Sequence, residues 1–194
     1  MNFLFHLYLS GDDAEILVGN LMGDFVKGKL AGRFPAGIEE GIMFHRRIDS
    51  FAGMNRHFLG SKRRLDVRFG HFRGVLVDLY YDHFLAVHWD DYAAVPFMQF
   101  LADTRLTVKR YGNVLPDRLR AVEPYIFGEL LPSYLEVAGI ERALTRMSGR
   151  IERRNPLAEG GEELRRHYGE ICEDFRGFIA EAREFAREER KITV

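Results

Sequence analysis

The sequence has little cysteine and lacks any long apolar run. Cys172 is the single cysteine among 194 residues, so no disulfide can form within one chain, which fits a reducing compartment. The apolar run at residues 3–9, FLFHLYL, contains His6 and has no basic segment before it. It is too short for a membrane span and does not resemble a signal peptide, and no later run approaches the length of a span. The sequence therefore predicts a cytoplasmic protein that does not insert into a membrane.

Several functional motifs are also missing. The formal net charge is −1, which gives no reason to expect nucleic-acid binding. The glycine-containing stretches GRFPAG and AEGGEE match neither a P-loop nor a dinucleotide-binding fingerprint. The chain offers no Ser-His-Asp or Cys-His array, and it contains no internal repeat or low-complexity tract. Nucleotide-binding folds of these types and nucleophilic triads are therefore not indicated.

What the sequence does contain is helical periodicity from end to end. Asp12 and Asp13 precede the apolar-periodic stretch 14–28 in the manner of helix-capping residues, and Pro35 opens a helix through residue 51. No alternating strand pattern and no Asn-Gly or Asp-Gly hairpin turn is present. With 46% hydrophobic residues, the sequence predicts one all-α domain spanning residues 1–194, with about eight helices. Further helices are expected over residues 77–89, 92–111, 133–153 and 157–190, and Pro116, Pro124 and Pro132 punctuate short helices.

Three pairs of polar residues occur at helical spacing within apolar segments. Residues four apart lie on the same face of a helix, and each pair is surrounded by residues that should pack inward. Buried ionised groups need partners, and a divalent metal is one solution because aspartate oxygen and histidine nitrogen are common ligands. We therefore expect the three helices to face one another around a metal site. The pairs are Asn20 with Asp24, His45 with Asp49, and Asp78 with Asp82.

A structural interpretation of these pairs remains open. Arg46 and Arg47 are placed to pair with Asp24 or Asp78 and so to tie helices together. For any one pair this structural role is the commoner outcome. Three pairs on neighbouring apolar segments favour a functional site, although clustered titratable groups indicate function only statistically.

Other candidate residues lie outside the pairs. His6, alone in an apolar run, is typical of a core histidine with a satisfied hydrogen bond. His71 lies between arginines just before the segment with Asp78, which suits a general acid, a phosphate contact or a surface residue. The basic segment 62–73 suits an anionic substrate or an acidic partner, because arginine binds phosphate with two hydrogen bonds; a solvated helix face is the alternative. Its candidate contacts are Arg63, Arg64 and Arg68.

Four stretches, in this order, resemble the acyl carrier protein phosphodiesterases: MNFLFHLYLS, GNLMGDFVKG, GIMFHRRIDSF and VDLYYDHFLAVHW. The resemblance is strong over residues 1–90 and looser beyond. It implies an all-helical fold similar to HD-domain phosphohydrolases. It also implies manganese-dependent hydrolysis of holo-acyl carrier protein to the apo form and 4′-phosphopantetheine. By motif, it implies metal ligands among Asp24, His45, Asp49, Asp78 and Asp82, with His6, Asn20, Arg46 and His83 nearby.

On this hypothesis the metal activates water, and the carrier's serine oxygen leaves phosphorus. His71 or His83 protonates that oxygen, and Arg46 helps to hold the phosphate. Arg63, Arg64 and Arg68 contact the phosphate or the acidic carrier surface, while His6 and Asn20 contact the substrate. Two other functions stay open: a phosphohydrolase of a nucleotide or small phosphoester, and a non-catalytic module that binds an acidic partner through residues 62–73.

Overall fold

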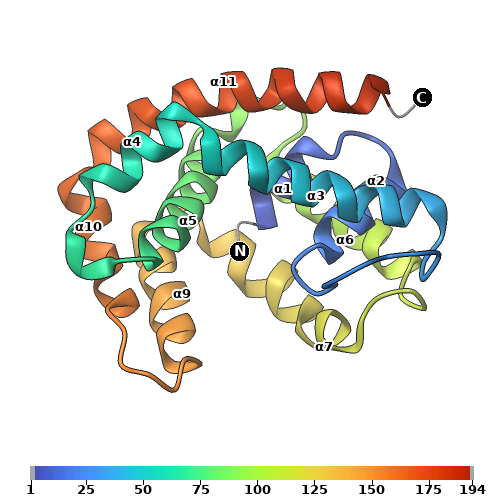
Figure 1. The fold of residues 1–194 in the computed structure, drawn as a ribbon, viewed down its shortest axis with the longest axis horizontal. Helices are drawn as coiled ribbons and strands as arrows, with labels where there is room; N and C mark the ends of the chain where they lie inside the picture. The colour runs from blue at the N-terminus through green and yellow to red at the C-terminus, as the bar shows by residue number, and fades with distance from the viewer. Residues whose placement is uncertain (1–2, 193–194) are drawn as a thin grey trace.

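A computed structural model describes residues 3–192, and this part of the chain is helical almost throughout (Figure 1). It runs from α1 (Phe3–Leu9) to α11 (Tyr168–Ile192) and contains no β-strand between these two helices. The all-α prediction is confirmed. The helices outnumber the expected eight because some are very short, such as α8 (Leu131–Ser133) and α10 (Gly160–Arg166). The other α-helices are α2 (Ala14–Met22), α3 (Ala36–Met54), α4 (Arg56–Arg64), α5 (Phe72–Val87), α6 (Phe97–Arg110), α7 (Asp117–Tyr125) and α9 (Val137–Gly149).

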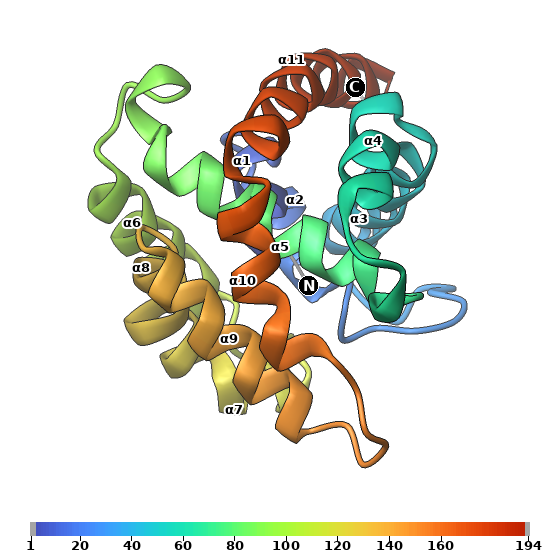
Figure 2. The same cartoon turned by 90° about the vertical axis from the view of Figure 1, so that its left-hand side faces the viewer.

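Helix α5 is the central element of the fold. Its buried side chains point in nearly all directions, as expected for a helix surrounded by others rather than lying at the surface. It packs against α1, α4, α9 and α11. In Figure 2 it lies between a group formed by α3, α4 and α11 and a second group formed by α6, α7, α8 and α9. The buried apolar residues of both groups join in one core.

Two glycines bring α2 and α3 into backbone contact. A Cβ atom on Gly19 would lie 2.2 Å from the carbonyl oxygen of Ile38 and 2.8 Å from the Cα of Gly41. A Cβ atom on Gly41 would lie 2.5 Å from the carbonyl oxygen of Ile16. Only residues without a side chain permit so close a crossing. The crossing brings Asn20, next to Gly19, against the helix that carries His45.

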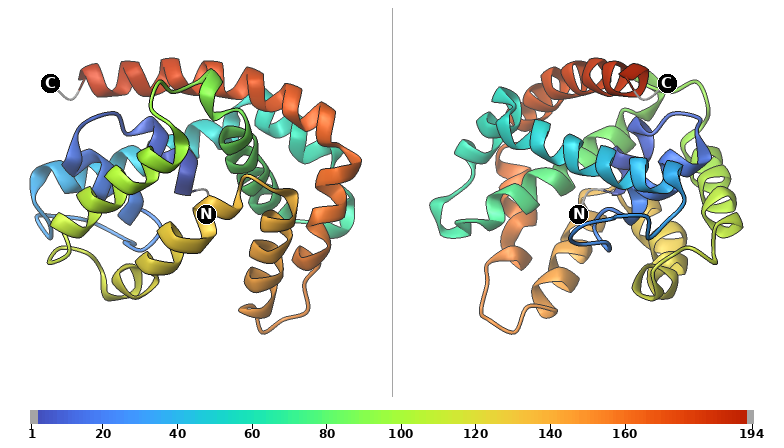
Figure 3. Two further views of the ribbon diagram at one scale, coloured as in Figure 1. Left: turned by 180° about the vertical axis from the view of Figure 1, so that it is seen from behind. Right: turned by 45° about the vertical axis from the view of Figure 1, so that its right-hand side comes forward.

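The capping predictions are confirmed, and one long-helix prediction is corrected. The Asp13 carboxylate accepts hydrogen bonds from the backbone amides of Glu15 and Ile16 at the start of α2, and Pro35 directly precedes α3. The single helix expected over residues 157–190 is wrong, because the chain leaves helical geometry at His167 and separates α10 from α11. In Figure 3, α9 and α10 lie side by side at one end of the molecule.

The segment after α7 departs from ordinary α-helical geometry. Residues Ile126–Leu130 form one turn of π-helix, which leads directly into α8. Such turns are rare and occur often at functional sites. This π-turn and the neighbouring helix α9 form one wall of the pocket described below. Within residues 3–192, no helix is both long and apolar enough to cross a membrane.

Candidate metal-binding site and adjoining pocket

Three side chains from two helices meet at one point. His6 comes from the short helix α1, and His45 and Asp49 come from successive turns of α3. The Nε2 atoms of His6 and His45 each lie 3.3 Å from a different carboxylate oxygen of Asp49. One ligand atom from each residue falls within 4.8 Å of the other two, a spacing that suits a shared metal ion. Nitrogen and carboxylate ligands of this kind bind divalent cations.

Asn20 determines which nitrogen each histidine presents to this point. The backbone carbonyl of Asn20 accepts a hydrogen bond from His45 Nδ1 at 2.8 Å, because a carbonyl oxygen can only accept. The Asn20 side-chain nitrogen donates to the carbonyl of His6 and to Ser10, so its oxygen is the acceptor for His6 Nδ1, also at 2.8 Å. Both histidines therefore carry their proton on Nδ1. In the neutral form, both Nε2 lone pairs then point toward Asp49, as metal ligation requires.

The two imidazole rings are packed tightly against each other. Their centroids lie 3.8 Å apart, and the ring planes differ by 14°. Burial lowers the pKa of His6, and repulsion from a charged His45 lowers it further. A neutral His6 has no Nε2 proton to give to Asp49, so lone pairs and carboxylate oxygens face one another. Such an electron-rich point is suited to a cation.

The neighbouring aspartates add negative charge to the cluster. The Asp24 carboxylate lies 3.9 Å from His45 Nε2. Burial raises the pKa of Asp78 to about 6, and the nearby carboxylates of Asp49 and Asp24 raise it too. Burial also acts to raise the pKa of Asp49, but hydrogen bonds and charge from His45 and His6, when these carry a proton on Nε2, outweigh it and lower that pKa well below its ordinary value. Two of the three predicted pairs, together with Asp78, are thus brought to one locality.

Asp82 has partners other than this cluster. Its two carboxylate oxygens accept hydrogen bonds from the backbone amides of Leu4, at 3.1 Å, and Phe5, at 2.9 Å. Burial raises the pKa of Asp82 to about 8, and these two hydrogen bonds oppose the rise. The contacts fit a residue that anchors the first turn of α1, and they lend no support to the prediction that Asp82 binds the metal.

The predicted catalytic residues lie in different surroundings. His83 is buried away from the triad, with Nδ1 donating to the carbonyl of Tyr134 at 2.8 Å and Nε2 lying 3.0 Å from the Tyr168 hydroxyl. His71 is exposed at the start of α5, with its ring beside Phe72. Arg46 donates hydrogen bonds to the carbonyls of Val26 and Gly28 and so ties the loop after Asp24 to α3. Their predicted catalytic roles remain untested by this arrangement.

The predicted substrate-binding residues are also separated. Asn20 is fully buried and contacts the histidines, and His6 lies within the triad itself. In the basic segment, Arg64 pairs with Asp174 at 2.9 Å and Arg68 pairs with Glu159 at 2.7 Å. Arg63 is exposed, and none of the described residues forms an ion pair with it. Much of the positive charge in this segment is thus neutralised within the molecule.

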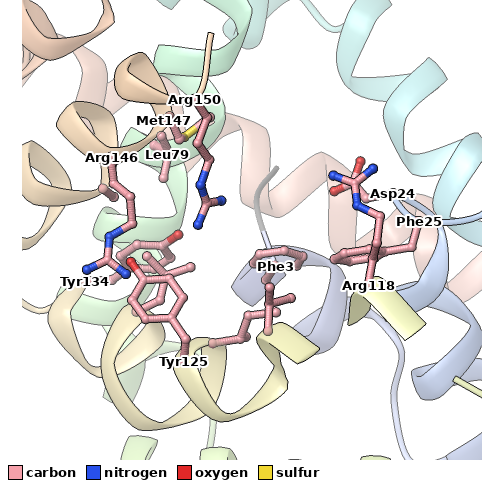
Figure 4. Close-up of a pocket in the computed structure, with 14 residues that line it drawn as sticks. Phe3, Asp24, Phe25, Leu79, Arg118, Tyr125, Tyr134, Arg146, Met147 and Arg150 are labelled. Carbon is pink, nitrogen blue, oxygen red and sulfur yellow. The ribbon is translucent and has the colours of Figure 1, made fainter. Parts of the chain in front are cut away.

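A cavity of about 320 Å³ adjoins the cluster and shares Asp24 with it. Its walls come from α1, the turn after α2, α5, α7, the π-turn and α9, so residues distant in sequence form it (Figure 4). Most of its lining is aromatic or aliphatic, and three arginines also contribute: Arg118, Arg146 and Arg150. The volume and the apolar lining suit a small organic ligand or a flexible substituent.

Sequence reasoning did not identify His6 as a ligand or these arginines as site residues. A usable signal exists for His6, because an imidazole in an otherwise apolar helix must find a polar partner. No comparable signal exists for Arg118, Arg146 and Arg150, which reach the cavity through tertiary packing of two helices distant from residues 1–90.

Comparison with known proteins identifies close similarity over most of the chain. The family model for acyl carrier protein phosphodiesterase matches residues 1–182. A curated protein of that name from Klebsiella pneumoniae is 32% identical over 176 residues, covering 88% of this chain and 90% of the relative. Another from Yersinia pestis is 31% identical, and the match covers 87% of this chain and 88% of the relative. A third, from Serratia proteamaculans, is 27% identical, and the match covers 98% of this chain and 100% of the relative. No solved structure matches the chain significantly.

Proposed function

The chain belongs to the acyl carrier protein phosphodiesterase family, and from this premise we propose that it hydrolyses holo-acyl carrier protein to the apo form and 4′-phosphopantetheine. The observation that carries the proposal is the triad itself. Two histidines and one aspartate present ligand atoms within 4.8 Å of one another, with both tautomers set by Asn20. This arrangement lies at the edge of a cavity, where a substrate can reach it.

The residues of the triad fit a divalent cation, for which Mn²⁺ is the candidate. His6 and His45 offer Nε2 lone pairs, and Asp49 offers a carboxylate with 58% of its side chain exposed, so the site is open to solvent on one side. Asp24 and Asp78 supply further negative charge. When bound, a divalent cation would polarise a phosphoryl oxygen and lower the pKa of bound water. The likeness to HD-domain phosphohydrolases stays a prediction.

The reaction is the addition of water across one phosphodiester bond. A water oxygen joins phosphorus, the bond from phosphorus to the carrier's serine oxygen breaks, and that oxygen takes up a proton. The protein's residues supply binding and orientation. Asp24 belongs to both the triad's surroundings and the cavity, so a phosphodiester beside the triad has its remaining substituents directed along the cavity. The buried faces of His6 and His45 limit access of bulk water from the interior side.

Mass spectrometry of holo-acyl carrier protein tests the proposal directly. Incubation with the protein and Mn²⁺ should remove the phosphopantetheine mass, and a chelator should prevent the loss until Mn²⁺ is restored. The variants His45→Gln and Asp49→Asn should bind Mn²⁺ weakly and leave the carrier intact. Asp90→Asn is the matched control, because Asp90 is exposed and forms no contact with the triad.

An unchanged carrier after incubation with metal-loaded wild-type protein would refute the proposal. Including nucleotides and simple phosphodiesters as substrates separates it from a broader phosphohydrolase activity. Turnover of these small esters together with an intact carrier would assign the site to a different substrate class.

A further inference from the structure

We propose that the cavity beside Asp24 binds the pantetheine arm of the carrier's prosthetic group, while the arginines at its rim contact an acidic surface of the carrier protein. This inference rests on the proposed function and adds the place where the arm lies. It is carried by three observations that are independent of the metal site: an apolar floor, a tyrosine hydroxyl that lines the cavity, and three arginines without carboxylate partners.

The floor of the cavity is apolar and well ordered by packing. Phe3, Leu79, Tyr134 and Ala143 are buried in the core and also line the cavity. Phe3 belongs to α1, Leu79 to α5 and Ala143 to α9, and Tyr134 directly follows α8. All four pack in the same hydrophobic core. A ligand portion of mixed aliphatic and amide character can bury its aliphatic part against such a floor. The pantetheine arm has this character.

The Tyr134 hydroxyl gives the floor one specific polar group. The residue is 1% exposed overall, and residues 3–192 show no hydrogen bond to its hydroxyl, which is not among the buried unpartnered atoms and so is open to a ligand. Figure 4 shows the Tyr134 side chain directed into the cavity. A tyrosine hydroxyl that lines a cavity can both donate a hydrogen bond to a ligand and accept one from it. An amide group of the pantetheine arm can provide that partner.

Three arginines surround the entrance. Arg118, Arg146 and Arg150 are all exposed, and none of them forms an ion pair with a carboxylate in the described part of the chain. Arg146 instead lies over the ring of Tyr125, with 4.2 Å between guanidinium carbon and ring centroid. In Figure 4, Arg118 and Asp24 lie on one side of Phe3, and Arg146 and Arg150 lie on the other. Unpaired guanidinium groups around one opening favour an anionic surface.

Asp24 links the cavity to the site of the proposed reaction. Asp24 lines the cavity and also lies 3.9 Å from His45 Nε2. A phosphodiester held at the triad can therefore extend its arm over Phe3 toward Tyr134, while the serine side of the diester, with its protein, remains at the rim. The π-turn Ile126–Leu130 contributes to this wall, which is consistent with the frequent occurrence of π-turns at functional sites.

Calorimetric titration with pantetheine, which lacks the phosphate, tests the floor. Met147→Trp places a larger side chain at the partly exposed wall of the cavity and should abolish binding. Tyr134→Phe removes only the hydroxyl and should weaken binding by about tenfold, the effect of one lost hydrogen bond. Tyr111→Phe is the matched control outside the cavity and should bind as the wild type does. Equal binding by wild type, Tyr134→Phe and Met147→Trp, or no binding by the wild type, would overturn the inference.

Kinetics with holo-carrier protein test the rim. The triple variant Arg118→Gln/Arg146→Gln/Arg150→Gln should raise KM at least about tenfold and make kcat/KM much less sensitive to salt, because rim charges act mainly on association. Its kcat should change less than its KM. Arg110→Gln, an exposed arginine of α6, is the matched control. An unchanged KM and salt dependence in the triple variant would remove the carrier-contact part of the inference.

The two measurements separate this inference from the proposed function. Pantetheine binding that is lost in Met147→Trp, with no turnover of the carrier by the wild type, would support the cavity and refute the activity. Turnover by the wild type that is equal in Met147→Trp and Tyr134→Phe would support the activity and refute the cavity assignment.

Discussion

The side-chain oxygen of Asn20 accepts a hydrogen bond from His6 Nδ1 at 2.8 Å, and this contact directs the opposite nitrogen of the ring toward Asp49. The backbone carbonyl of the same residue does the same for His45. One buried residue thus orients both imidazoles of the site. Its position depends on the close crossing of α2 and α3 at Gly19 and Gly41.

Replacing Asn20 by alanine should weaken metal binding without removing a ligand. Loss of an outer contact to a metal-binding histidine typically lowers metal affinity by about 10- to 100-fold. Titration of the variant with Mn²⁺ measures the change. Asn55→Ala is the matched control, because Asn55 caps α4 and should affect stability by about 1 kcal/mol while leaving Mn²⁺ affinity unchanged. Wild-type affinity in Asn20→Ala would show that the histidines keep their orientation without it.

Gly23→Ala should displace the His45 ring. A Cβ atom at this position would lie 2.1 Å from Cγ of His45, closer than atoms can approach, so the ring must move. We expect at least a tenfold loss of Mn²⁺ affinity and of carrier turnover. Gly53→Ala, within α3 and facing open space, is the matched control and should raise helix stability by about 0.5–1 kcal/mol. Equal metal affinity in the two variants would contradict the tight fit around His45.

Asp82→Ala should reduce stability as well as activity. The change leaves the buried amides of Leu4 and Phe5 without their acceptor, which should cost about 2 kcal/mol or more. Asp82→Asn keeps one acceptor oxygen, so its free energy of unfolding should fall less than that of Asp82→Ala. Urea unfolding of the two variants without added metal measures this order. If Asp82 were instead a metal ligand with no anchoring role, both variants would unfold like the wild type in the absence of metal.

His83 should make the protein less stable in mild acid. Burial lowers its pKa, so the folded protein resists a proton that the unfolded chain accepts near pH 6.5. Stability from this group is therefore present above pH 6.5 and declines as the pH falls below it. When the pH is lowered from 7.5 to 5.5, the free energy of unfolding of His83→Gln should fall by up to about 1.4 kcal/mol less than that of the wild type.

Unfolding curves at the two pH values provide the comparison. His6, also buried with a lowered pKa, contributes equally to both proteins and so cancels. Identical losses in wild type and His83→Gln would mean that His83 is already free to take up a proton in the folded state.

The sequence predicted the helices and part of the site because both depend on local periodicity. Helical spacing correctly placed His45 and Asp49 on one face of α3, and the capping residues correctly marked the start of α2. The same spacing could not show that Asp78 and Asp82 would meet different partners. Asp78 lies near the acidic cluster, whereas Asp82 meets the start of α1, and that difference depends on how α5 is rotated against its neighbours.

Other features depend on contacts that no local pattern contains. His6 was read as a core histidine, and it is buried, but its partners come from α2 and α3. The positive segment at residues 62–73 fits either an anionic ligand or a solvated helix face, and no local pattern shows that Arg64 and Arg68 pair with acidic residues more than 90 positions later in the chain. The arginines of the cavity rim are ordinary surface residues in the sequence and acquire a shared location only through tertiary packing.

The short helix that carries His6 has a consequence for the protein's motions. A helix of seven residues is not stable in isolation, so α1 stays helical only through its contacts with the rest of the protein. Asp82 holds its first turn through the hydrogen bonds to Leu4 and Phe5. An ion bound between His6 and α3 would fix the helix at a second point. Binding of the ion should therefore slow hydrogen exchange at the backbone amides of Leu4 and Phe5 when Mn²⁺ is added.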